Sequence, residues 1–417
     1  MSDARAIRLR IEKLVAGGDG LAFHEGRAVF VPLALPGETV EARVDEARRD
    51  YAKAELLGIL EPSPRRVDPP CPIYAVCGGC NLQHLDYPAQ VEAKALILEE
   101  AFRRTGRMDL GALTVLPSPP FGYRNRLQLH VAPGGGLGFM RRSGNEVVEA
   151  PSCPIAVEAL RAWIEEQARL RRDAGPASAT AGSMPGSDRS GANPRRAGAS
   201  GAPRRGAVSE GDDGPSRFVV FGSGDKVWVE RGEAEVAVAG EQIRFRVDGF
   251  FQSNLRLLEF LVPRLLEGLS GEKAADLYCG VGLFSRFLGR RFAQLTCVER
   301  EAAALELARR NVPGHAGARR EFAALGVEDW VRGRSAEGRF DCVLADPPRT
   351  GLSASVRSWM TRARIPALLY LSCDPVTMAR DVGELTRSGY TLESLEGLDF
   401  YPQTSHLESF ARLAWRG

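Results

Sequence analysis

The stretch Ala274-Ala275-Asp276-Leu277-Tyr278-Cys279-Gly280-Val281-Gly282-Leu283-Phe284-Ser285 decides the fold class. Its first five residues predict a strand that carries an acid, and the glycines predict a tight turn that opens a helix. Leu295 to Glu299 predicts a second strand, which ends in an acid about twenty residues after the glycines. Strands that alternate with helices indicate an α/β domain with a parallel sheet.

The residues around this turn have the chemistry of a nucleoside pocket. Gly280 and Gly282 let the backbone approach a ligand, and Glu299 stands where an acid holds ribose hydroxyls. A dinucleotide site favours a third glycine where this chain has Ser285, and the acid Asp276 precedes the turn. This combination favours S-adenosyl-L-methionine over a dinucleotide.

Two later strands of the same domain end in reactive side chains. Residues 341–345 predict a strand that leads into Asp346-Pro347-Pro348-Arg349, and residues 365–371 predict one that leads into Ser372-Cys373-Asp374-Pro375. Open α/β sheets bind ligands outside the carboxyl ends of their strands, so we expect Asp346 and Cys373 at one site. A thiolate there can attack carbon, although a lone cysteine is as often a small core residue.

Glu408 stands in a polar segment, residues 399–409, that leads into a final strand from Phe410 to Trp415. An acid in such a loop is commonly solvated. Its aromatic and proline-marked setting beside the expected site favours a functional carboxylate.

Length and charge limit the class of protein. The 417 residues are enough for two or three domains. The 55 basic and 53 acidic residues give a net charge of +2, so any basic surface for nucleic acid must be local. The sequence has neither an apolar run long enough to span a bilayer nor a secretory signal, so we expect a soluble cytoplasmic protein.

Residues 5–62 predict a small β domain. Strands are expected at 7–11, 27–31, 38–44 and 52–60, with a turn at Gly17-Gly18-Asp19-Gly20. Short strands with glycine turns suggest an OB-like barrel, a common RNA-binding scaffold. A barrel without a ligand fits the pattern equally well.

Half of the eight cysteines fall in one pattern, which argues against a disulfide scaffold. Cys77-Gly78-Gly79-Cys80 has the spacing of a metal-binding knuckle, and Cys71 lies six residues upstream. Cys153 is the only other cysteine before residue 279. Four thiolates fit either a structural zinc ion or an iron–sulfur cluster, and the neighbouring prolines favour the cluster modestly.

The middle of the chain predicts one helix and several strands. Tyr87 to Arg104 predicts an amphipathic helix with Val91, Ala95, Leu98 and Phe102 on one face. Strands are expected at 124–131, 137–141, 146–149, 217–221, 227–230 and 243–247. Arg124 could contact phosphate, but the alternation around it is more typical of a solvated strand face. Residues 172–216, rich in Gly, Ala, Ser, Pro and Arg, predict a disordered basic insertion.

Taken in order, these motifs resemble those of the RNA uracil-5-methyltransferases, and most closely the bacterial branch that acts on 23S ribosomal RNA. The resemblance covers nearly the whole chain apart from residues 172–216. It rests on the four cysteines, Tyr123-Arg124-Asn125, Phe250-Phe251-Gln252-Ser253-Asn254, the turn 276–282, Asp346-Pro347-Pro348-Arg349, Ser372-Cys373-Asp374-Pro375 and His406-Leu407-Glu408-Ser409.

The resemblance implies three domains and two cofactors. Residues 1–64 would form an OB-like TRAM domain, residues 65–247 a small central α+β iron–sulfur domain, and residues 248–417 an α/β Rossmann-like class I methyltransferase domain. It implies contacts to S-adenosyl-L-methionine and ligands to a 4Fe-4S cluster. The cofactor contacts would be Gln252, Tyr278, Gly280, Gly282, Glu299 and Asp346, and the cluster ligands Cys71, Cys77, Cys80 and Cys153.

The resemblance also implies a mechanism that organic chemistry supports. The Cys373 thiolate would add at carbon 6 of uracil, carbon 5 would take the methyl group, and Glu408 would remove the carbon 5 proton. Phe250 could stack on a base. The expected partner is RNA, 23S rRNA first and tRNA second, and the expected form is a monomer. Leu283, Gly326 and Gln403 differ from what relatives carry at those places.

Three other readings stay open at this point. The same chemistry could act on a transfer-RNA T-loop uridine. The chain could instead be an RNA-binding or folding factor with a decayed catalytic site. A redox iron–sulfur protein is the third, but it leaves the glycine turn and the Asp346 and Cys373 strand ends unexplained.

Overall fold

The computed structural model describes residues 6–174, 217–312, 314, 317–333 and 339–417. The predicted insertion at 172–216 lies outside the described residues from 175 onward. Residues 172–174, which the composition assigned to the insertion, are instead the last turn of helix α2 (Glu158–Ala174).

The N-terminal strands form one sheet of order β1-β5-β6-β4-β3-β2. Only Ile11 and Glu12 separate β1 from β2, yet these strands stand at opposite ends of the order, so the sheet curls into a barrel. Alternate residues such as Leu9, Val29 and Val40 point into its core. The predicted OB-like barrel is confirmed. Its strands are β1 (Ile7–Arg10), β2 (Lys13–Leu14), β3 (Gly20–His24), β4 (Arg27–Val31), β5 (Thr39–Ala47) and β6 (Tyr51–Glu61).

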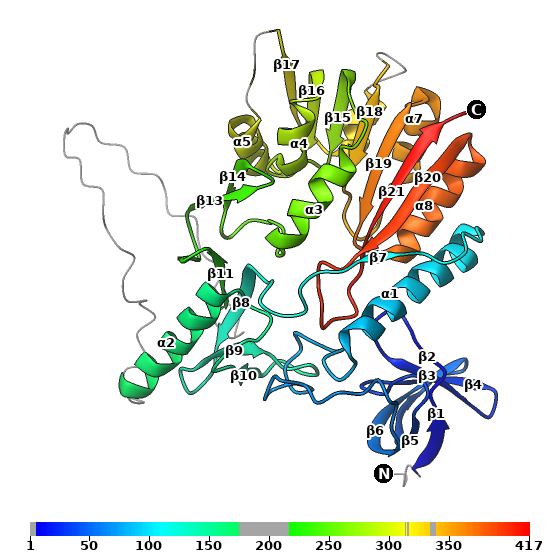
Figure 1. Ribbon diagram of the computed structural model, residues 1–417, viewed down its shortest axis with the longest axis vertical. Coiled ribbons are helices and arrows are strands. Elements are labelled where there is room, and N and C mark those ends of the chain that lie inside the picture. Colours follow the sequence, from blue (N-terminus) through cyan, green and yellow to red (C-terminus); the bar gives the residue numbers. More distant parts are fainter. Residues whose placement is uncertain (1–5, 175–216, 313, 315–316, 334–338) are drawn as a thin grey trace.

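Helix α1 (Tyr87–Ala101) lies between the barrel and the large C-terminal sheet (Figure 1). The Asp86 carboxylate caps its first turn by accepting a hydrogen bond from the Ala89 N–H, and Pro88 fits the first turn because it needs no donor there. Leu98 and the following Phe102 are fully buried, as the predicted apolar face requires. The last predicted turn widens into a π-helix, Phe102–Gly106.

A central five-stranded antiparallel sheet has the order β10-β9-β8-β11-β12. Helix α2 packs on it through Leu160 and Ile164. The predicted strands are confirmed within a few residues. They are β8 (Arg126–Val131), β9 (Leu137–Met140), β10 (Val147–Glu149), β11 (Arg217–Ser223) and β12 (Lys226–Val229).

The C-terminal sheet has eight strands in the order β17-β16-β15-β18-β19-β21-β20-β7. Strand β21 runs antiparallel to its neighbours β19 and β20, and the other pairs are parallel. This is the predicted α/β Rossmann-like arrangement. The strands are β7 (Val115–Leu116), β15 (Gly271–Leu277), β16 (Phe292–Glu299), β17 (Arg319–Ala324), β18 (Cys342–Ala345), β19 (Ala367–Ser372), β20 (Tyr390–Leu398) and β21 (Glu408–Trp415).

Helices bury both faces of this sheet. On β19, Leu369 and Leu371 face one apolar core, while Leu368 and Tyr370 face the other. Both sides of a parallel strand are then buried, which explains the continuous apolar run in the sequence. The first core takes α3 (Leu255–Leu265), α4 (Leu283–Leu288) and α5 (Ala302–Asn311), and the second takes α1, α6 (Val327–Arg332), α7 (Ala354–Ala363) and α8 (Pro375–Arg387).

The hairpin β13 (Glu233–Val238) and β14 (Glu241–Arg246) packs with the C-terminal sheet. Val236 and Phe245 share the apolar core of helix α3. The predicted domain limits at 64 and 247 stay predictions, and this packing favours placing the hairpin with the C-terminal domain.

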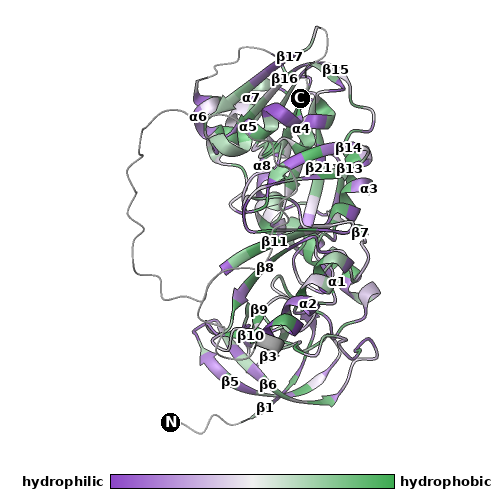
Figure 2. Ribbon diagram, turned by 90° about the vertical axis from the view of Figure 1, so that its left-hand side faces the viewer, coloured by the Kyte–Doolittle hydropathy of each residue, from purple (hydrophilic) through white to green (hydrophobic). Residues whose placement is uncertain are grey.

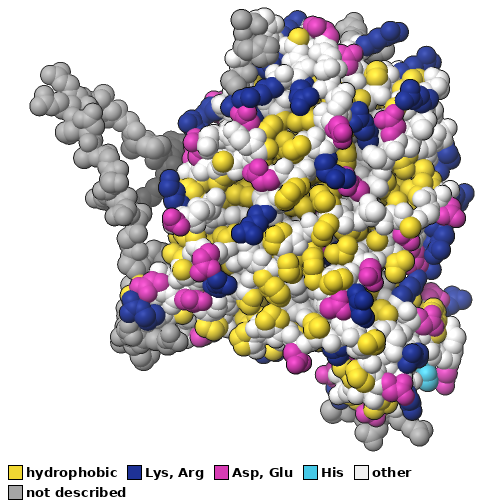
Figure 3. All heavy atoms as spheres, in the orientation of Figure 1, with side chains coloured by type: hydrophobic (Ala, Val, Ile, Leu, Met, Phe, Trp, Pro, Cys, Tyr) yellow, Lys and Arg dark blue, Asp and Glu magenta, His cyan; other side chains and the backbone are white. Residues whose placement is uncertain are grey.

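The three larger sheets follow one another along the long axis of the molecule (Figure 2). Acidic and basic side chains are interspersed over the face shown in Figure 3, and hydrophobic side chains gather across its middle. Among the described helices, none is long and apolar enough to cross a membrane.

Candidate active site

The carboxyl ends of five parallel strands, β17, β16, β15, β18 and β19, meet at one edge of the large sheet. The strand order reverses between β15 and β18, and ligands bind at such switch points. A cavity of about 1070 Å³ opens there. It is lined by most of the predicted site residues, namely Gln252, Tyr278, Gly280, Glu299, Asp346, Cys373 and Glu408.

Strand pairing brings the two predicted catalytic side chains together. Ser372 of β19 pairs with Ser409 of β21 in antiparallel register, and the Ser409 hydroxyl donates to the Ser372 carbonyl at 3.3 Å. Cys373 follows Ser372 and Glu408 precedes Ser409, so both lie at the same end of this strand pair. Glu408 is the first residue of β21, which begins two residues earlier than predicted, so it is not in the loop.

Burial raises the pKa of the acidic groups of the cavity, and neighbouring charges add to the shift at Cys373 and Glu408. Burial, followed by the charges of Glu408 and Asp346, raises the pKa of Cys373 to about 11. Burial and the Asp346 charge raise the pKa of Glu408 to about 8, and burial raises the pKa of Asp346 to about 6. Arg349 opposes the shifts at Cys373 and Glu408. The cavity therefore favours a cationic ligand, which would help these groups lose their protons.

Glu299 holds the glycine turn in place. One carboxylate oxygen accepts the Gly280 N–H at 3.0 Å, and the other accepts the Glu301 N–H at 2.8 Å. Tyr278 begins the turn in the left-handed region, with φ of 63°, and its hydroxyl donates to Glu328 Oε1 at 3.2 Å. Such backbone strain in a non-glycine residue is typical of functional turns.

Gly282 is the one predicted cofactor residue that does not line the cavity. A Cβ at this position would lie 3.0 Å from Ala308 Cβ on α5, and the φ is 78°. Gly282 therefore serves the close packing of the turn against α5. Asp276 is buried and accepts a hydrogen bond from the Ser285 hydroxyl. Ser285 stands where a dinucleotide site would have its third glycine, and this bond gives its side chain a structural role.

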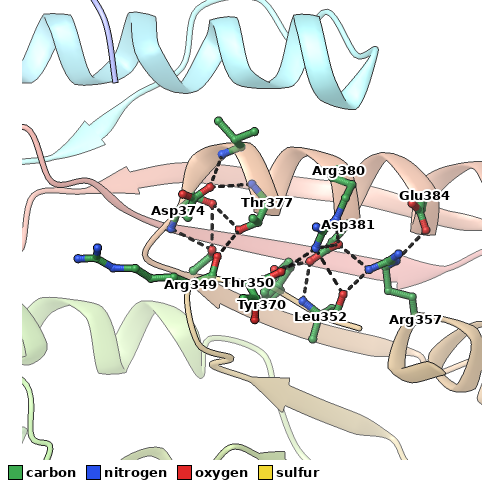
Figure 4. A network of polar contacts seen from close by, with 12 residues as sticks. Arg349, Thr350, Leu352, Arg357, Tyr370, Asp374, Thr377, Arg380, Asp381 and Glu384 are labelled. Atoms are coloured by element: carbon green, nitrogen blue, oxygen red, sulfur yellow. Dashed lines mark hydrogen bonds and ion pairs between the residues drawn. The ribbon is translucent and has the colours of Figure 1, made fainter. Parts of the chain in front are cut away.

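A buried polar network ties the Asp346 loop to the Cys373 strand (Figure 4). Asp381 accepts hydrogen bonds from the Leu352 N–H at 2.7 Å and from the Tyr370 hydroxyl at 2.8 Å. Thr377 Oγ1 donates to the Arg349 carbonyl at 3.3 Å. The Arg349 side chain itself points away from this network and lines the cavity.

Several cavity residues escaped the sequence analysis or were misjudged. Arg124 was expected on a solvated strand face, but it lines the cavity, 5.6 Å from the Tyr401 ring centroid. Tyr401 and His406 also line the cavity, and so does Glu328. The acidic start of helix α6 is the signal that could have indicated Glu328. Phe250 lines the cavity with 73% of its surface exposed.

Comparison with known proteins decides the family. The TRAM domain model matches residues 5–57, and the tRNA (uracil-5-)-methyltransferase model matches residues 222–415. A protein of Azoarcus sp. strain BH72, named 23S rRNA (uracil(1939)-C(5))-methyltransferase RlmD, is 35% identical over 96% of this chain and 98% of its own. The chain belongs to the RNA (uracil-5-)-methyltransferase family. A protein of the same name from Shewanella halifaxensis is 32% identical over 97% of this chain and 95% of its own.

A solved structure supports the fold of this methyltransferase. The crystal structure of the Pyrococcus abyssi tRNA (uracil-54, C5)-methyltransferase in complex with S-adenosyl-L-homocysteine matches with a TM-score of 0.70. The match covers 98% of this chain and 100% of the other, at 24% identity. This match confirms the predicted class of fold, and the family confirms the predicted class of enzyme.

The three residues that differ from the family pattern are accommodated in this methyltransferase. Leu283 starts α4 and lines the cavity. Gly326 also lines it, and a Cβ there would lie 3.1 Å from Arg300 Nη2. Gln403 is buried, and its side-chain oxygen accepts a hydrogen bond from Gln90 Nε2 at 3.0 Å.

The four cysteines of the predicted cluster share a second cavity of about 350 Å³. All four are free thiols. Burial raises the pKa of Cys80 to about 11 and that of Cys153 to about 12. In the described part of the chain, however, no three potential ligands stand close enough together to hold a metal ion.

The surroundings of this second cavity still fit a group with negative charge. Arg142 lines it, and its Nε atom is buried without a hydrogen-bond partner among the described residues. His130 Nδ1, which can donate as an N–H, is buried and unpaired in the same way. A metal centre held by four thiolates is anionic. The four cysteines and the nearby Arg142 therefore have the chemistry for such a centre, although the sulfur atoms are not close enough together to coordinate it.

Proposed function

We propose that this enzyme transfers a methyl group from S-adenosylmethionine to carbon 5 of a specific uridine in 23S rRNA, through a covalent bond between Cys373 Sγ and carbon 6. One observation carries the proposal. The register of β19 and β21 sets Cys373 beside Glu408 over the cavity that also exposes Asp346 and the glycine turn.

The chemistry needs a nucleophile and a base, because carbon 5 of uracil is a poor nucleophile. The Cys373 thiolate adds to carbon 6, and the electrons of the 5,6 double bond move to the carbonyl oxygen on carbon 4 as an enolate. Carbon 5 then takes the methyl group of the sulfonium, and S-adenosylhomocysteine leaves. Glu408 removes the carbon 5 proton, the carbon 6–sulfur bond breaks, and the double bond and the thiolate return.

The electrostatics of the cavity support this order of events. A protonated Cys373 thiol cannot add to carbon 6, and a protonated Glu408 cannot act as a base. A cationic sulfonium in the same cavity lowers the pKa of both groups, as Arg349 already does. Binding of the methyl donor then prepares the nucleophile.

The placement of the other lining residues supports roles in binding. The methyl donor binds in the cavity around the switch point of the sheet. Its contacts there are Gln252, Tyr278, Gly280, Glu299 and Asp346. Phe250 offers an exposed ring on which the target base stacks. Gly282 assists them by packing the turn against α5.

The second cavity holds a 4Fe-4S cluster in this proposal. Cys71, Cys77, Cys80 and Cys153 are its ligands, supported by their shared cavity and by the unpaired Arg142 Nε. The cluster takes a structural part, since it ties the loop at 71–80 to the central sheet.

The choice of 23S rRNA rests on the relatives that share the whole chain. The Azoarcus and Shewanella proteins carry that substrate in their names and align over at least 96% of this chain. A tRNA uridine is the alternative, since the structural match is named for tRNA. An enzyme with this substrate works in the cytoplasm, and one chain supplies all the residues named above, so we propose a monomer.

The test is methyl transfer from labelled S-adenosylmethionine to total RNA of a strain that lacks this gene, with the product mapped. Label in 23S rRNA at carbon 5 of a uridine is expected. Label in tRNA would keep the roles of Cys373 and Glu408 and overturn the substrate. No label in either RNA would overturn the proposed activity.

A further inference from the structure

Residues 399–407 join β20 to β21 and end directly before Glu408. We call this segment the base loop. Side chains from residues far earlier in the chain hold it from outside the methyltransferase sheet. These side chains are Asn81, Tyr87, Gln90, Lys94 and Tyr123.

The start of the base loop is fixed by a buried ion pair. Lys94 Nζ lies 2.6 Å from Asp399 Oδ1, and both side chains are almost fully buried. The Tyr87 hydroxyl donates to Asp399 Oδ2 at 3.0 Å, and the Tyr123 hydroxyl donates to the Pro402 carbonyl at 2.8 Å. Buried polar groups of this kind hold a unique geometry, because each loses its partner if the loop moves.

The end of the base loop, next to Glu408, depends on Asn81. Its Nδ2 donates to Ser405 Oγ at 3.0 Å, and its Oδ1 accepts the Ser405 N–H at 2.8 Å. The same Nδ2 donates to the Gly17 carbonyl in a turn of the barrel at 2.7 Å. The Asn81 N–H donates to the Gln403 carbonyl at 3.1 Å.

This junction is tightly packed. A Cβ at Gly18 would lie 2.6 Å from Asn81 Nδ2 and 2.9 Å from Ser405 Cβ. Asn81 directly follows Cys80, and Gly78 and Gly79 of the same segment line the active-site cavity. One side chain thus joins the barrel, the cysteine segment and the base loop.

We infer that Asn81 is a positioning residue, which holds the base loop at Ser405 and so fixes the carboxylate of Glu408 three residues later. This inference rests on the proposed role of Glu408 as the base. Proton removal from carbon 5 is the step that needs the carboxylate, whereas addition of Cys373 and methyl transfer precede it. A loosened base loop therefore slows the release of product more than it slows the formation of the methylated adduct.

The test measures the covalent protein–RNA adduct with in vitro transcribed 23S rRNA and S-adenosylmethionine labelled in the methyl group. In the full-length Asn81→Ala variant we expect turnover to fall about ten- to a hundredfold, because a small misplacement of a catalytic group costs that much. Labelled adduct that resists denaturant should accumulate, with little change in KM. Asn81→Asp keeps the acceptor for the Ser405 N–H and should recover part of the turnover.

Two further variants separate the possible failures. Glu408→Gln should accumulate the labelled adduct outright, and if it does not, the base role in the proposed function is wrong. If Glu408→Gln traps the adduct and Asn81→Ala does not, the positioning role alone is overturned. Lys13→Met removes a 2.6 Å ion pair between the barrel and Glu100 of α1 without touching the base loop, and should turn over like the unchanged enzyme.

Discussion

Ser372 and Ser409 face each other across the antiparallel pair β19–β21, and this register decides the chemistry of the site. The residue after the first serine is Cys373, and the residue before the second is Glu408. Because side chains alternate along a strand, a slip of one residue would turn one of the two away from the cavity. The hydroxyl of Ser409, bonded to the Ser372 carbonyl, helps to keep the register.

Cys373→Ala should abolish methyl transfer, because Cys279, the other thiol that lines the cavity, is 8% exposed and lies in the turn after β15, away from Glu408 at the end of β19 and β21. Binding of S-adenosylmethionine should survive, since Cys373 is only one of many cavity residues. Single-turnover methylation and calorimetric titration of the cofactor measure the two effects. Cys342→Ala, in the buried core of β18, is the control and should keep activity while losing some stability. Full turnover by Cys373→Ala would contradict the covalent mechanism.

Activity should rise with pH up to about pH 8. The pKa of Glu408 is raised to about 8 by burial and Asp346, and the base must be unprotonated to act. Below that value kcat, which includes the proton removal by Glu408, should increase about tenfold per pH unit, whereas kcat/KM also depends on the Cys373 thiolate. Arg349 lowers the pKa of both Glu408 and Cys373, so Arg349→Met should move this rise to higher pH. Arg362→Met, on the exposed side of α7, serves as the control, and a move to lower pH in Arg349→Met would refute the assignment.

Glu408→Gln should stabilise the protein at alkaline pH. The pKa of Glu408 is raised from its ordinary value of 4.5 to about 8, so the folded state binds the proton more tightly than the unfolded state does. Stability is then lost as pH rises from 4.5 through 8, and glutamine has no such loss. Thermal unfolding should show equal Tm values at pH 4.5 and a higher Tm for Glu408→Gln at pH 9. Glu25→Gln, exposed on the barrel, should show no such divergence.

Local sequence patterns predicted most of the strands that carry the site. Two apolar runs, each followed closely by a proline, predicted strands β18 and β19, with Asp346 and Cys373 directly after them. Strand β17 was missed, because Arg319 to Ala324 lies at the sheet edge and has no continuous apolar run. Edge strands contact the core on fewer sides and so carry a weaker pattern.

Contacts between distant parts of the chain could not be predicted in this way. Arg124 and Tyr401 are 277 residues apart, and only the folded chain brings Arg124 over the ring and into the cavity. The base loop is similar, because nothing in the local pattern of helix α1 indicates that Lys94 is buried against Asp399. A local pattern carries no information on which distant segment will cover it.

The cysteine site gives a prediction on metal content. Anaerobically purified protein should be brown, with about four irons per chain. Cys153→Ser should lose the colour and the iron, because the other three thiols cannot complete the centre, whereas Cys342→Ser should keep both. Iron analysis and the visible absorption spectrum measure this. A colourless protein that holds zinc would show that the cluster assignment is wrong.

Gly282→Ala should lower the stability of the protein more than Gly280→Ala does. A Cβ at Gly282 meets Ala308 Cβ at 3.0 Å and Cα at 3.1 Å, and the φ of 78° disfavours any side chain. Strain and overpacking together should lower the free energy of unfolding by about 2 kcal/mol or more in urea titrations. At Gly280 a Cβ meets nothing within 4 Å, so only the φ of 53° disfavours a side chain there. The loss of unfolding free energy in Gly280→Ala should therefore be smaller. Gly280 lines the cavity, so Gly280→Ala should instead weaken S-adenosylmethionine binding. If Gly282→Ala weakened binding at unchanged stability, Gly282 would be a contact residue after all.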